Sequence, residues 1–298
     1  SRTLWCMRAL VLSGGGAKIH YHVGAALALL KTEPEYDLFA GISAGALVAA
    51  YLAQFPRGFS DEASSCLEAL TKTMRFEDVA QPWWPLGRVA GLWRSSLYDA
   101  TPLHKLVRRA FSAEAIRASG RKLRIGAVSL DGGEYATFSE QCEFIHDAIL
   151  ASCAFPGFFL PVDIHGQLFV DGGVRVYTPI AAAIDAGATH IDVVMTSPKD
   201  PSPSRLRKAG ALHVMARSLD LMMDEVMDKD LKLVEIYNQL ALANPTGTDK
   251  KPIVARVIRP QHELPIGTWD FDSPHIATVQ MCGLKDAQLA LNPGALID

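Results

Sequence analysis

Cysteine is scarce and scattered in this chain. Five cysteines occur among 298 residues, with no C-x-x-C pair and no zinc-like cluster with histidine. The sequence therefore predicts neither a disulfide framework nor a metal site. An odd, dispersed set of this kind is typical of reduced, buried thiols in a cytosolic-type protein.

Long apolar runs and blocks of like charge are also missing. The longest apolar stretch, residues 38–53, is short for a membrane span and is interrupted by two glycines. The net charge is −3 and no run of Lys or Arg occurs, which disfavours a nucleic-acid partner. The chain begins at Ser1 rather than Met, so we expect it to be trimmed, and secretion stays open.

What the chain does have is the pentapeptide Gly41-Ile42-Ser43-Ala44-Gly45. It follows an apolar run and precedes a small-residue helix predicted over residues 44–54. Strand, sharp turn and helix is the context of a nucleophile elbow. The helix N-terminus beyond the serine offers N–H groups and a positive dipole end to a developing oxyanion. The alternative is a tight turn in which the serine only caps the helix.

The order of predicted elements indicates an α/β fold with a central, mostly parallel sheet and helices on both faces. Hydrophobic residues make up 49% of the chain, enough for a sizeable core, and one domain over residues 1–298 is favoured. Strands are predicted at residues 8–13, 36–42, 123–130, 134–139 (a hairpin), 168–170, 190–196 and 253–258. Helices are predicted at residues 17–31, 60–73 with Ser60 as cap, 101 onward, 145–152, 179–186, 206–243, and 274 onward with Ser273 as cap.

A glycine run, Gly14-Gly15-Gly16, lies between the first strand and the first helix. Such a run presents bare N–H groups to an anion. The spacing does not fit a phosphate-binding P-loop, and Ile19 occupies the last glycine position of a dinucleotide fingerprint. An oxyanion hole beside the elbow fits both position and order, and a tight turn without ligand is the alternative. Lys18 either braces this loop or is a solvated charge.

The base that would accept the serine proton is not determined by the residues alone. Four histidines lie late enough in the chain for a triad, and none has a distinctive setting: His190, His213, His262 and His275. Asp171-Gly172-Gly173 places a carboxylate at a predicted strand end, where it can act as a general base. The same tripeptide begins at Asp131 in a predicted hairpin, so spacing does not separate base from turn.

The motifs together resemble the patatin-like phospholipase family. That family carries a glycine-rich oxyanion motif, a G-x-S-x-G elbow, an A-S-x-x-x-P segment and a D-G-[GA] with a proline downstream. Here these are Gly14-Gly15-Gly16-Ala17-Lys18, Gly41-Ile42-Ser43-Ala44-Gly45, Ala151-Ser152-Cys153-Ala154-Phe155-Pro156, and Asp171-Gly172-Gly173 with Pro179. Residues 264–271 also look like the tail of compact bacterial members.

The resemblance implies a three-layer α/β/α fold and a Ser/Asp dyad without a catalytic histidine. Ser43 would be the nucleophile, Asp171 the base, and the N–H groups of Gly15 and Gly16, with Gly14, the oxyanion hole. The substrate would be a lipid acyl ester, as for a phospholipase A or lysophospholipase, and no metal or cofactor would be needed. The motif core would span about 8–196, with C-terminal elements over about 204–298.

Two positions depart from the family pattern. The family has glycine where this chain has Ile19, and often asparagine where it has Tyr177. Neither touches the dyad, so activity is expected. The alternatives kept open are a catalytically weak lipid-binding or signalling module, and a thioesterase or acyltransferase that uses the same site.

Three of the five tryptophans, Trp83, Trp84 and Trp93, lie in one irregular stretch, residues 81–93. Because tryptophan favours membrane interfaces, we hypothesise that this loop is a lid or a docking surface for lipid. The alternative is that the rings pack the loop onto the core. A cytoplasmic protein with peripheral membrane contact is expected, and the sequence gives no indication of oligomeric state.

Overall fold

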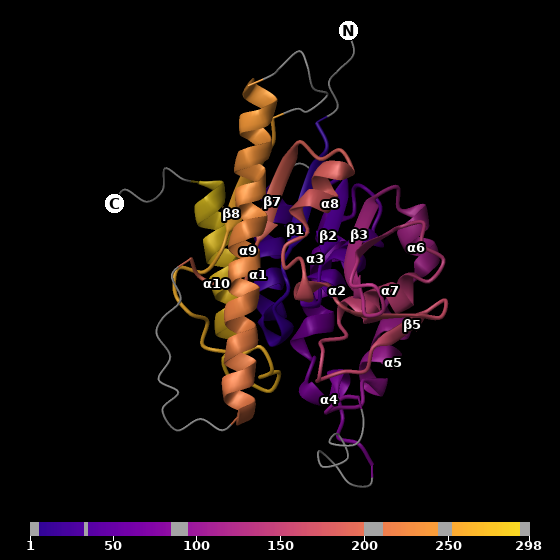
Figure 1. Cartoon of the computed structure of the whole chain (residues 1–298). Helices are drawn as coiled ribbons and strands as arrows, with labels where there is room; N and C mark the ends of the chain where they lie inside the picture. The colour runs from indigo at the N-terminus through magenta and orange to yellow at the C-terminus, as the bar shows by residue number, and fades with distance from the viewer. Residues whose placement is uncertain (1–5, 33–34, 85–94, 200–210, 244–251, 293–298) are drawn as a thin grey trace.

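A mixed, mostly parallel sheet lies at the centre of the fold (Figure 1). The computed structural model describes residues 6–32, 35–84, 95–199, 211–243 and 252–292. Within these residues the eight strands run in the order β5-β6-β3-β2-β1-β7-β8, and β4 pairs with β3. Their bounds are β1 Arg8–Leu12, β2 Leu38–Gly41, β3 Lys122–Ser129, β4 Tyr135–Ser139, β5 Val162–Ile164, β6 Gln167–Asp171, β7 His190–Val194 and β8 Val254–Ile258.

Strand direction changes at β3. The strands β3, β2, β1, β7 and β8 are parallel, whereas β4 and β6 pair antiparallel with β3, and β5 pairs antiparallel with β6. The β3–β4 connection is the predicted hairpin, where Gly133 takes a φ of +78°. Since β6 runs against β3, Asp171 at its end lies opposite Ala127 in the middle of the sheet.

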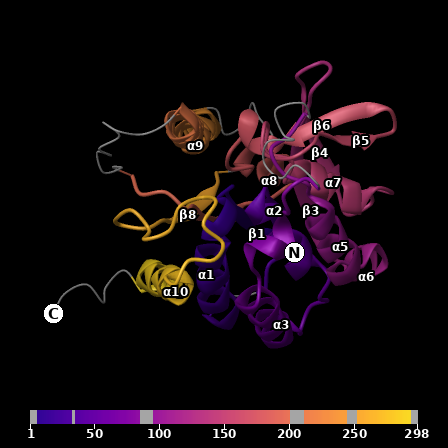
Figure 2. The same ribbon diagram turned by 90° about the horizontal axis from the view of Figure 1, so that it is seen from below.

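Helices cover both faces of the sheet, which confirms the predicted α/β/α layers (Figure 2). The longer helices are α1 Ile19–Thr32, α2 Ala44–Ala53, α3 Ser60–Lys72, α5 Thr101–Ala110, α7 Ile145–Ser152, α9 Ala211–Ala243 and α10 Ile276–Leu291; the short ones are α4 Phe76–Val79, α6 Ala113–Ala118 and α8 Ile180–Asp185. Alternation along β1 sets the two faces: Leu10 and Leu12 belong to the core under α1 and α2, and Val11 to the core under α8 and α9.

Two glycines allow α1 and α10 to pack so closely that their backbones are in contact. A Cβ atom on Gly24 would lie 1.8 Å from the Gln280 carbonyl oxygen, and one on Gly283 would lie 2.1 Å from that of Tyr21. The Tyr21 hydroxyl also donates a hydrogen bond of 2.7 Å to Asp286. Helix α1 follows the glycine loop directly, so α10 helps to fix where that loop lies.

Two predicted helix starts are wrong, each for a local reason. The last helix begins at Ile276 with His275 as N-cap, because the Ser273 hydroxyl instead accepts the His275 N–H in a preceding turn. Ser60 is the first residue of α3 and not its cap, since the Phe59 carbonyl already accepts the Ala63 N–H. The short elements β5, α4 and α6 were not predicted, and residues 206–210 of the predicted long helix lie outside the described residues.

Candidate active site

Ser43 stands in a strained turn between β2 and α2. Its φ is +55°, a conformation rare for a side chain other than glycine. Both flanking glycines are required by close packing: a Cβ on Gly45 would lie 2.4 Å from the Ser13 carbonyl oxygen, and one on Gly41 would lie 2.2 Å from that of Gly45. The Ser43 side chain makes no capping bond to α2, which excludes the cap interpretation. This is the geometry of a nucleophile elbow.

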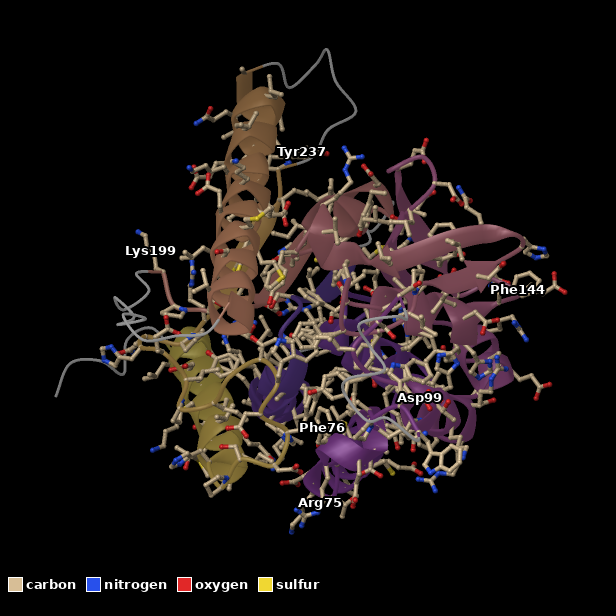
Figure 3. All side chains as sticks on the ribbon, turned by 60° about the horizontal axis from the view of Figure 1, so that its bottom comes forward. Arg75, Phe76, Asp99, Phe144, Lys199 and Tyr237 are labelled. Carbon is tan, nitrogen blue, oxygen red and sulfur yellow. The ribbon has the colours of Figure 1, made fainter. Side chains whose placement is uncertain are left out.

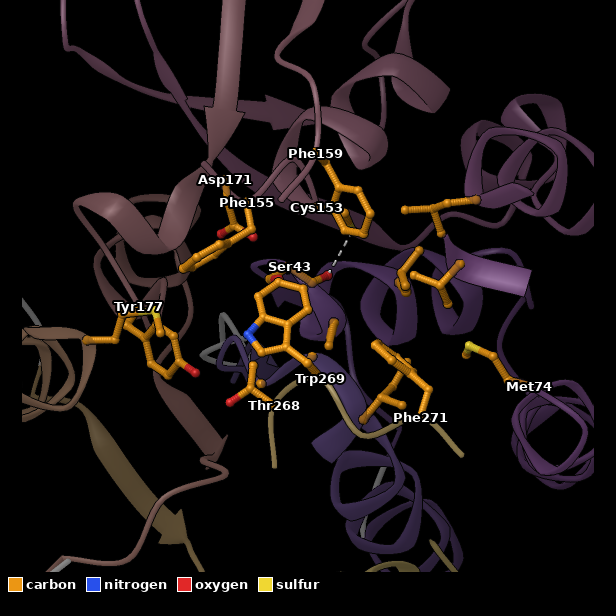
Figure 4. A pocket seen from close by; sticks show the side chains of 18 residues that line it. Ser43, Met74, Cys153, Phe155, Phe159, Asp171, Tyr177, Thr268, Trp269 and Phe271 are labelled. Atoms are coloured by element: carbon orange, nitrogen blue, oxygen red, sulfur yellow. Dashed lines mark hydrogen bonds between the residues drawn. The ribbon is translucent and has the colours of Figure 1, made fainter. Parts of the chain in front are cut away.

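Asp171 ends β6 and lines the same pocket as Ser43 (Figure 4). The residue is 1% exposed. Its Oδ1 accepts the Gly173 N–H at 2.8 Å, while its Oδ2 forms no hydrogen bond with any described residue. Burial raises the pKa of Asp171 to about 7, against the lowering effects of the Gly173 N–H and the nearby Ser43 hydroxyl. The Ser43 hydroxyl thus lies close enough to this carboxylate to lower its pKa.

The two copies of the Asp-Gly-Gly tripeptide have different structures. The copy at Asp131 is a surface hairpin turn, where the carboxylate accepts the Leu168 N–H. The copy at Asp171 instead opens a 3₁₀ turn, Gly172–Val174, against the sheet. A Cβ on Gly172 would lie 2.6 Å from the Gly126 carbonyl oxygen, so only glycine allows this approach.

The glycine loop is held at both ends by backbone hydrogen bonds. The N–H of Gly14 donates to the Tyr177 carbonyl at 3.1 Å, and the N–H of Ala17 donates to the Thr268 carbonyl at 2.7 Å. The Gly14 N–H is therefore engaged, which argues against the predicted role of Gly14 as an oxyanion donor.

Between these two ties, the N–H groups of Gly15 and Gly16 have no hydrogen-bond partner among the described residues. Both glycines line the pocket that contains Ser43, and Gly16 takes a φ of +54°. Free N–H groups on a fixed loop are suited to an oxyanion. Lys18 is the last residue of this turn and is half-buried. Its ammonium forms no hydrogen bond or salt bridge within the described part of the chain, so no contact shows it bracing the loop.

A buried carboxylate on α9 holds the loop that follows Asp171. Asp230 Oδ2 accepts the N–H of Tyr177 at 3.1 Å and that of Thr178 at 2.9 Å. Burial raises the pKa of Asp230 to about 6, although both N–H groups lower it. The Tyr177 ring packs so closely on Gly14 that a Cβ there would lie 2.6 Å from the ring. Sequence reasoning missed Asp230, because nothing local marks it.

The pocket in front of Ser43 is largely apolar. Its cavity volume is only about 50 Å³, so the space in front of Ser43 is narrow. Ile19, at the family's glycine position, forms part of its wall. Trp269 forms another part of the wall, and its ring stacks flat on that of Phe158 with ring centroids 3.9 Å apart. Thr268 and Phe271 also line the pocket, so the predicted C-terminal tail belongs to the site.

No described histidine lines this pocket, so the structure brings none of the three described candidate bases, His190, His262 and His275, to Ser43. His190 contacts Cys6 at the start of β7, and the side chain of His213 lies outside the described residues. His22 lies behind the glycine loop, where burial lowers its pKa to about 3 and keeps it neutral.

The predicted tryptophan loop is only partly described. Gln81 and Asp99 close its base with two backbone hydrogen bonds, at the side of the molecule that faces the viewer in Figure 3. Trp83 is half-buried and donates its N–H to the Ser96 carbonyl, whereas Trp84 is 88% exposed. Trp93 lies outside the described residues, and membrane docking stays a hypothesis. Among the described helices, none has the length and apolar content needed to cross a bilayer.

The family model of patatin-like phospholipases matches residues 10–184, which include the glycine loop, the elbow and Asp171. The chain belongs to the patatin-like phospholipase family. It is 29% identical over 207 residues to a patatin-like phospholipase domain-containing protein of Pyricularia oryzae, across 58% of this chain and 24% of that protein. It is 28% identical over 190 residues to the uncharacterized protein YqhO of Bacillus subtilis, across 57% of this chain and 64% of that protein.

This patatin-like chain therefore spans about a quarter of the length of the fungal relatives it matches. Two solved structures are similar at 15% sequence identity. VipD from Legionella pneumophila matches with a TM-score of 0.49 over 96% of this chain and 67% of that one. The ExoU–SpcU complex of Pseudomonas aeruginosa matches with a TM-score of 0.37 over 97% of this chain and 51% of that one.

Proposed function

We propose that this protein hydrolyses acyl esters of lipids, with Ser43 as nucleophile and Asp171 as general base. One observation carries the proposal: a buried carboxylate with an unpaired oxygen lies beside a serine on a strained elbow, in an apolar pocket. A pKa near 7 suits a group that must take a proton and return it within one cycle. Family membership supports the lipid ester as substrate.

In the first step, Ser43 Oγ attacks the ester carbonyl carbon while Asp171 Oδ2 accepts the hydroxyl proton. The carbonyl oxygen becomes an oxyanion, which the N–H groups of Gly15 and Gly16 stabilise. The tetrahedral intermediate then collapses: its bond to the leaving oxygen breaks, and Asp171 gives the proton to that oxygen. The alcohol leaves, and the acyl group stays on Ser43 as an ester.

In the second step, water replaces the alcohol. Asp171 takes a proton from the water as its oxygen attacks the acyl carbon, and the same N–H groups hold the second oxyanion. Collapse breaks the bond to Ser43 Oγ, which receives the proton from Asp171. The fatty acid leaves, and neither a metal nor an organic cofactor takes part in these steps.

The test is covalent labelling with a fluorophosphonate probe, followed by hydrolysis of a short-chain nitrophenyl ester. We expect the probe to label Ser43, and Ser43→Ala and Asp171→Asn each to lower turnover by roughly 10³-fold or more with the fold intact. Asp131→Asn is the matched control, since it changes the same tripeptide in the surface hairpin. Full activity in Asp171→Asn would contradict the dyad.

A further inference from the structure

A second apolar hollow adjoins the catalytic pocket on the side of Asp171. It is lined by Gly173 and Val174, just after Asp171, and by Leu221 and Met222 on α9. Phe155 and Met223 line both hollows, so they form the wall between them. In Figure 4, Phe155 lies beside Asp171, with Tyr177 beyond it on the same side. We call this second hollow the α9 groove.

The proposed mechanism predicts which half of the ester lies on the side of Asp171. The base returns its proton to the leaving oxygen, so the alcohol half of the ester must depart past Asp171. The acyl half extends from Ser43 in the other direction, among the apolar side chains of the catalytic pocket, such as Leu103 and Phe271. The α9 groove begins two residues after Asp171, which places it where the alcohol half must lie.

The α9 groove is unusually apolar for an exposed surface. Met222 is 65% exposed, and Leu221 and Val174 are each about half exposed, although all three line it. A cluster of exposed large apolar side chains commonly marks a binding surface. Lys229 and Glu225, paired at 3.2 Å on the same helix, supply the charged part of the lining.

We infer that the α9 groove binds a long hydrocarbon chain on the alcohol half of the substrate. This inference rests on the proposed function and makes the substrate class narrower. The preferred ester is then one whose leaving alcohol still carries an acyl chain, as in a diacyl glycerolipid. A lysolipid, whose leaving alcohol has only a polar headgroup, leaves the groove empty.

The experiment compares hydrolysis of a diacyl phosphatidylcholine and a lysophosphatidylcholine of the same chain. Both are presented in identical nonionic-detergent micelles, so any attachment to the micelle surface acts equally on the two. We expect wild type to favour the diacyl substrate in kcat/KM, and Met222→Glu to lower the diacyl-to-lyso ratio about tenfold. The matched control is Leu242→Glu, which changes an equally exposed residue (69%) at the far end of α9 and should leave the ratio unchanged.

Two results would overturn the inference: no diacyl preference in wild type, or an unchanged diacyl-to-lyso ratio in Met222→Glu because both lipids lose equally. Hydrolysis of the soluble nitrophenyl ester separates this failure from failure of the proposed function, because the leaving alcohol of that substrate carries no hydrocarbon chain for the groove to bind. Binding of a diether phosphatidylcholine by Ser43→Ala gives a second readout without catalysis. Adding Met222→Glu to Ser43→Ala should weaken this binding about tenfold. Equal binding by the single and the double variant would also overturn the inference.

Discussion

The burial of Asp171 links its protonation to the stability of the fold and, in the proposed mechanism, to the rate of hydrolysis. In the folded protein its pKa is about 7, whereas an exposed aspartate has a value near 3.8. Between pH 3.8 and about pH 7 the Asp171 carboxyl is protonated in the folded state and deprotonated in the unfolded state. Folding is therefore favoured most below the lower value, and stability decreases as pH rises toward 7. Above pH 7 the charged carboxylate is buried from water, and its Oδ2 has no hydrogen-bond partner among the described residues.

Asp171→Asn should therefore stabilise the protein at alkaline pH, because it removes the buried charge and keeps an oxygen for the Gly173 N–H. We expect a gain in unfolding free energy on the order of 1–4 kcal/mol at pH 8, falling toward zero near pH 4. Urea denaturation at several pH values measures this difference. A gain that did not change with pH would show that the charge is not its source.

The same pKa predicts the pH dependence of activity. A general base works only when deprotonated, so kcat/KM should rise between about pH 6 and 8 and then level off. In Ser43→Ala the nearby hydroxyl is lost, and the pKa of Asp171 should rise further. Initial rates on a soluble ester measure the first effect, and NMR titration of the carboxyl carbon measures the second. A flat profile from pH 5 to 9 would contradict the assignment of Asp171 as base.

At the level of elements, local sequence signals were sufficient to predict the strands and helix around Ser43. They did not reveal contacts between distant parts of the chain. Apolar runs and glycine turns placed β1, β2 and α2 within two residues, because strand, elbow and helix lie next to one another in the chain. The choice of Asp171 over Asp131 needed the family resemblance, since the two tripeptides differ only in their tertiary surroundings. Asp230 left no local sequence signal, because it acts on a loop more than fifty residues away.

The contact of Asp230 with the loop after Asp171 predicts a role for α9 in catalysis. Asp230→Ala leaves two buried N–H groups unpaired, so the loop should shift and kcat should fall roughly 10–100-fold with little change in KM. Asp230→Asn keeps one acceptor oxygen and should restore most of the rate. Steady-state kinetics of both variants, beside the exposed Glu235→Ala as control, tests this. Equal impairment of the Ala and Asn variants would contradict it.

At the level of the whole molecule, we propose that residues 1–298 form one domain. The pocket in front of Ser43 is lined by residues within the matched range 10–184 and also by Met223 on α9 and Trp269 before α10. Helix α1 buries most of its surface, and part of that burial is against α10. The C-terminal elements are therefore part of the core as well as of the site.

A single domain should unfold in a single transition. We expect tryptophan fluorescence and far-UV circular dichroism of residues 1–298 to report the same urea midpoint. A fragment of residues 1–196 exposes the α10-facing side of α1 and should lack cooperative unfolding and ester hydrolysis. A fragment that unfolded cooperatively and hydrolysed the nitrophenyl ester would show that two domains are present.

The tie between Ala17 and the Thr268 carbonyl has a consequence for the order of events during translation. When a ribosome has released residues 1–196, both Ser43 and Asp171 are already outside the exit tunnel. Thr268, whose carbonyl fixes the glycine loop, and Trp269, which forms part of the pocket wall, have not yet been made. The nascent chain thus carries both side chains of the proposed dyad before the pocket around them is complete, because Thr268, Trp269 and Phe271 of the pocket wall are made later.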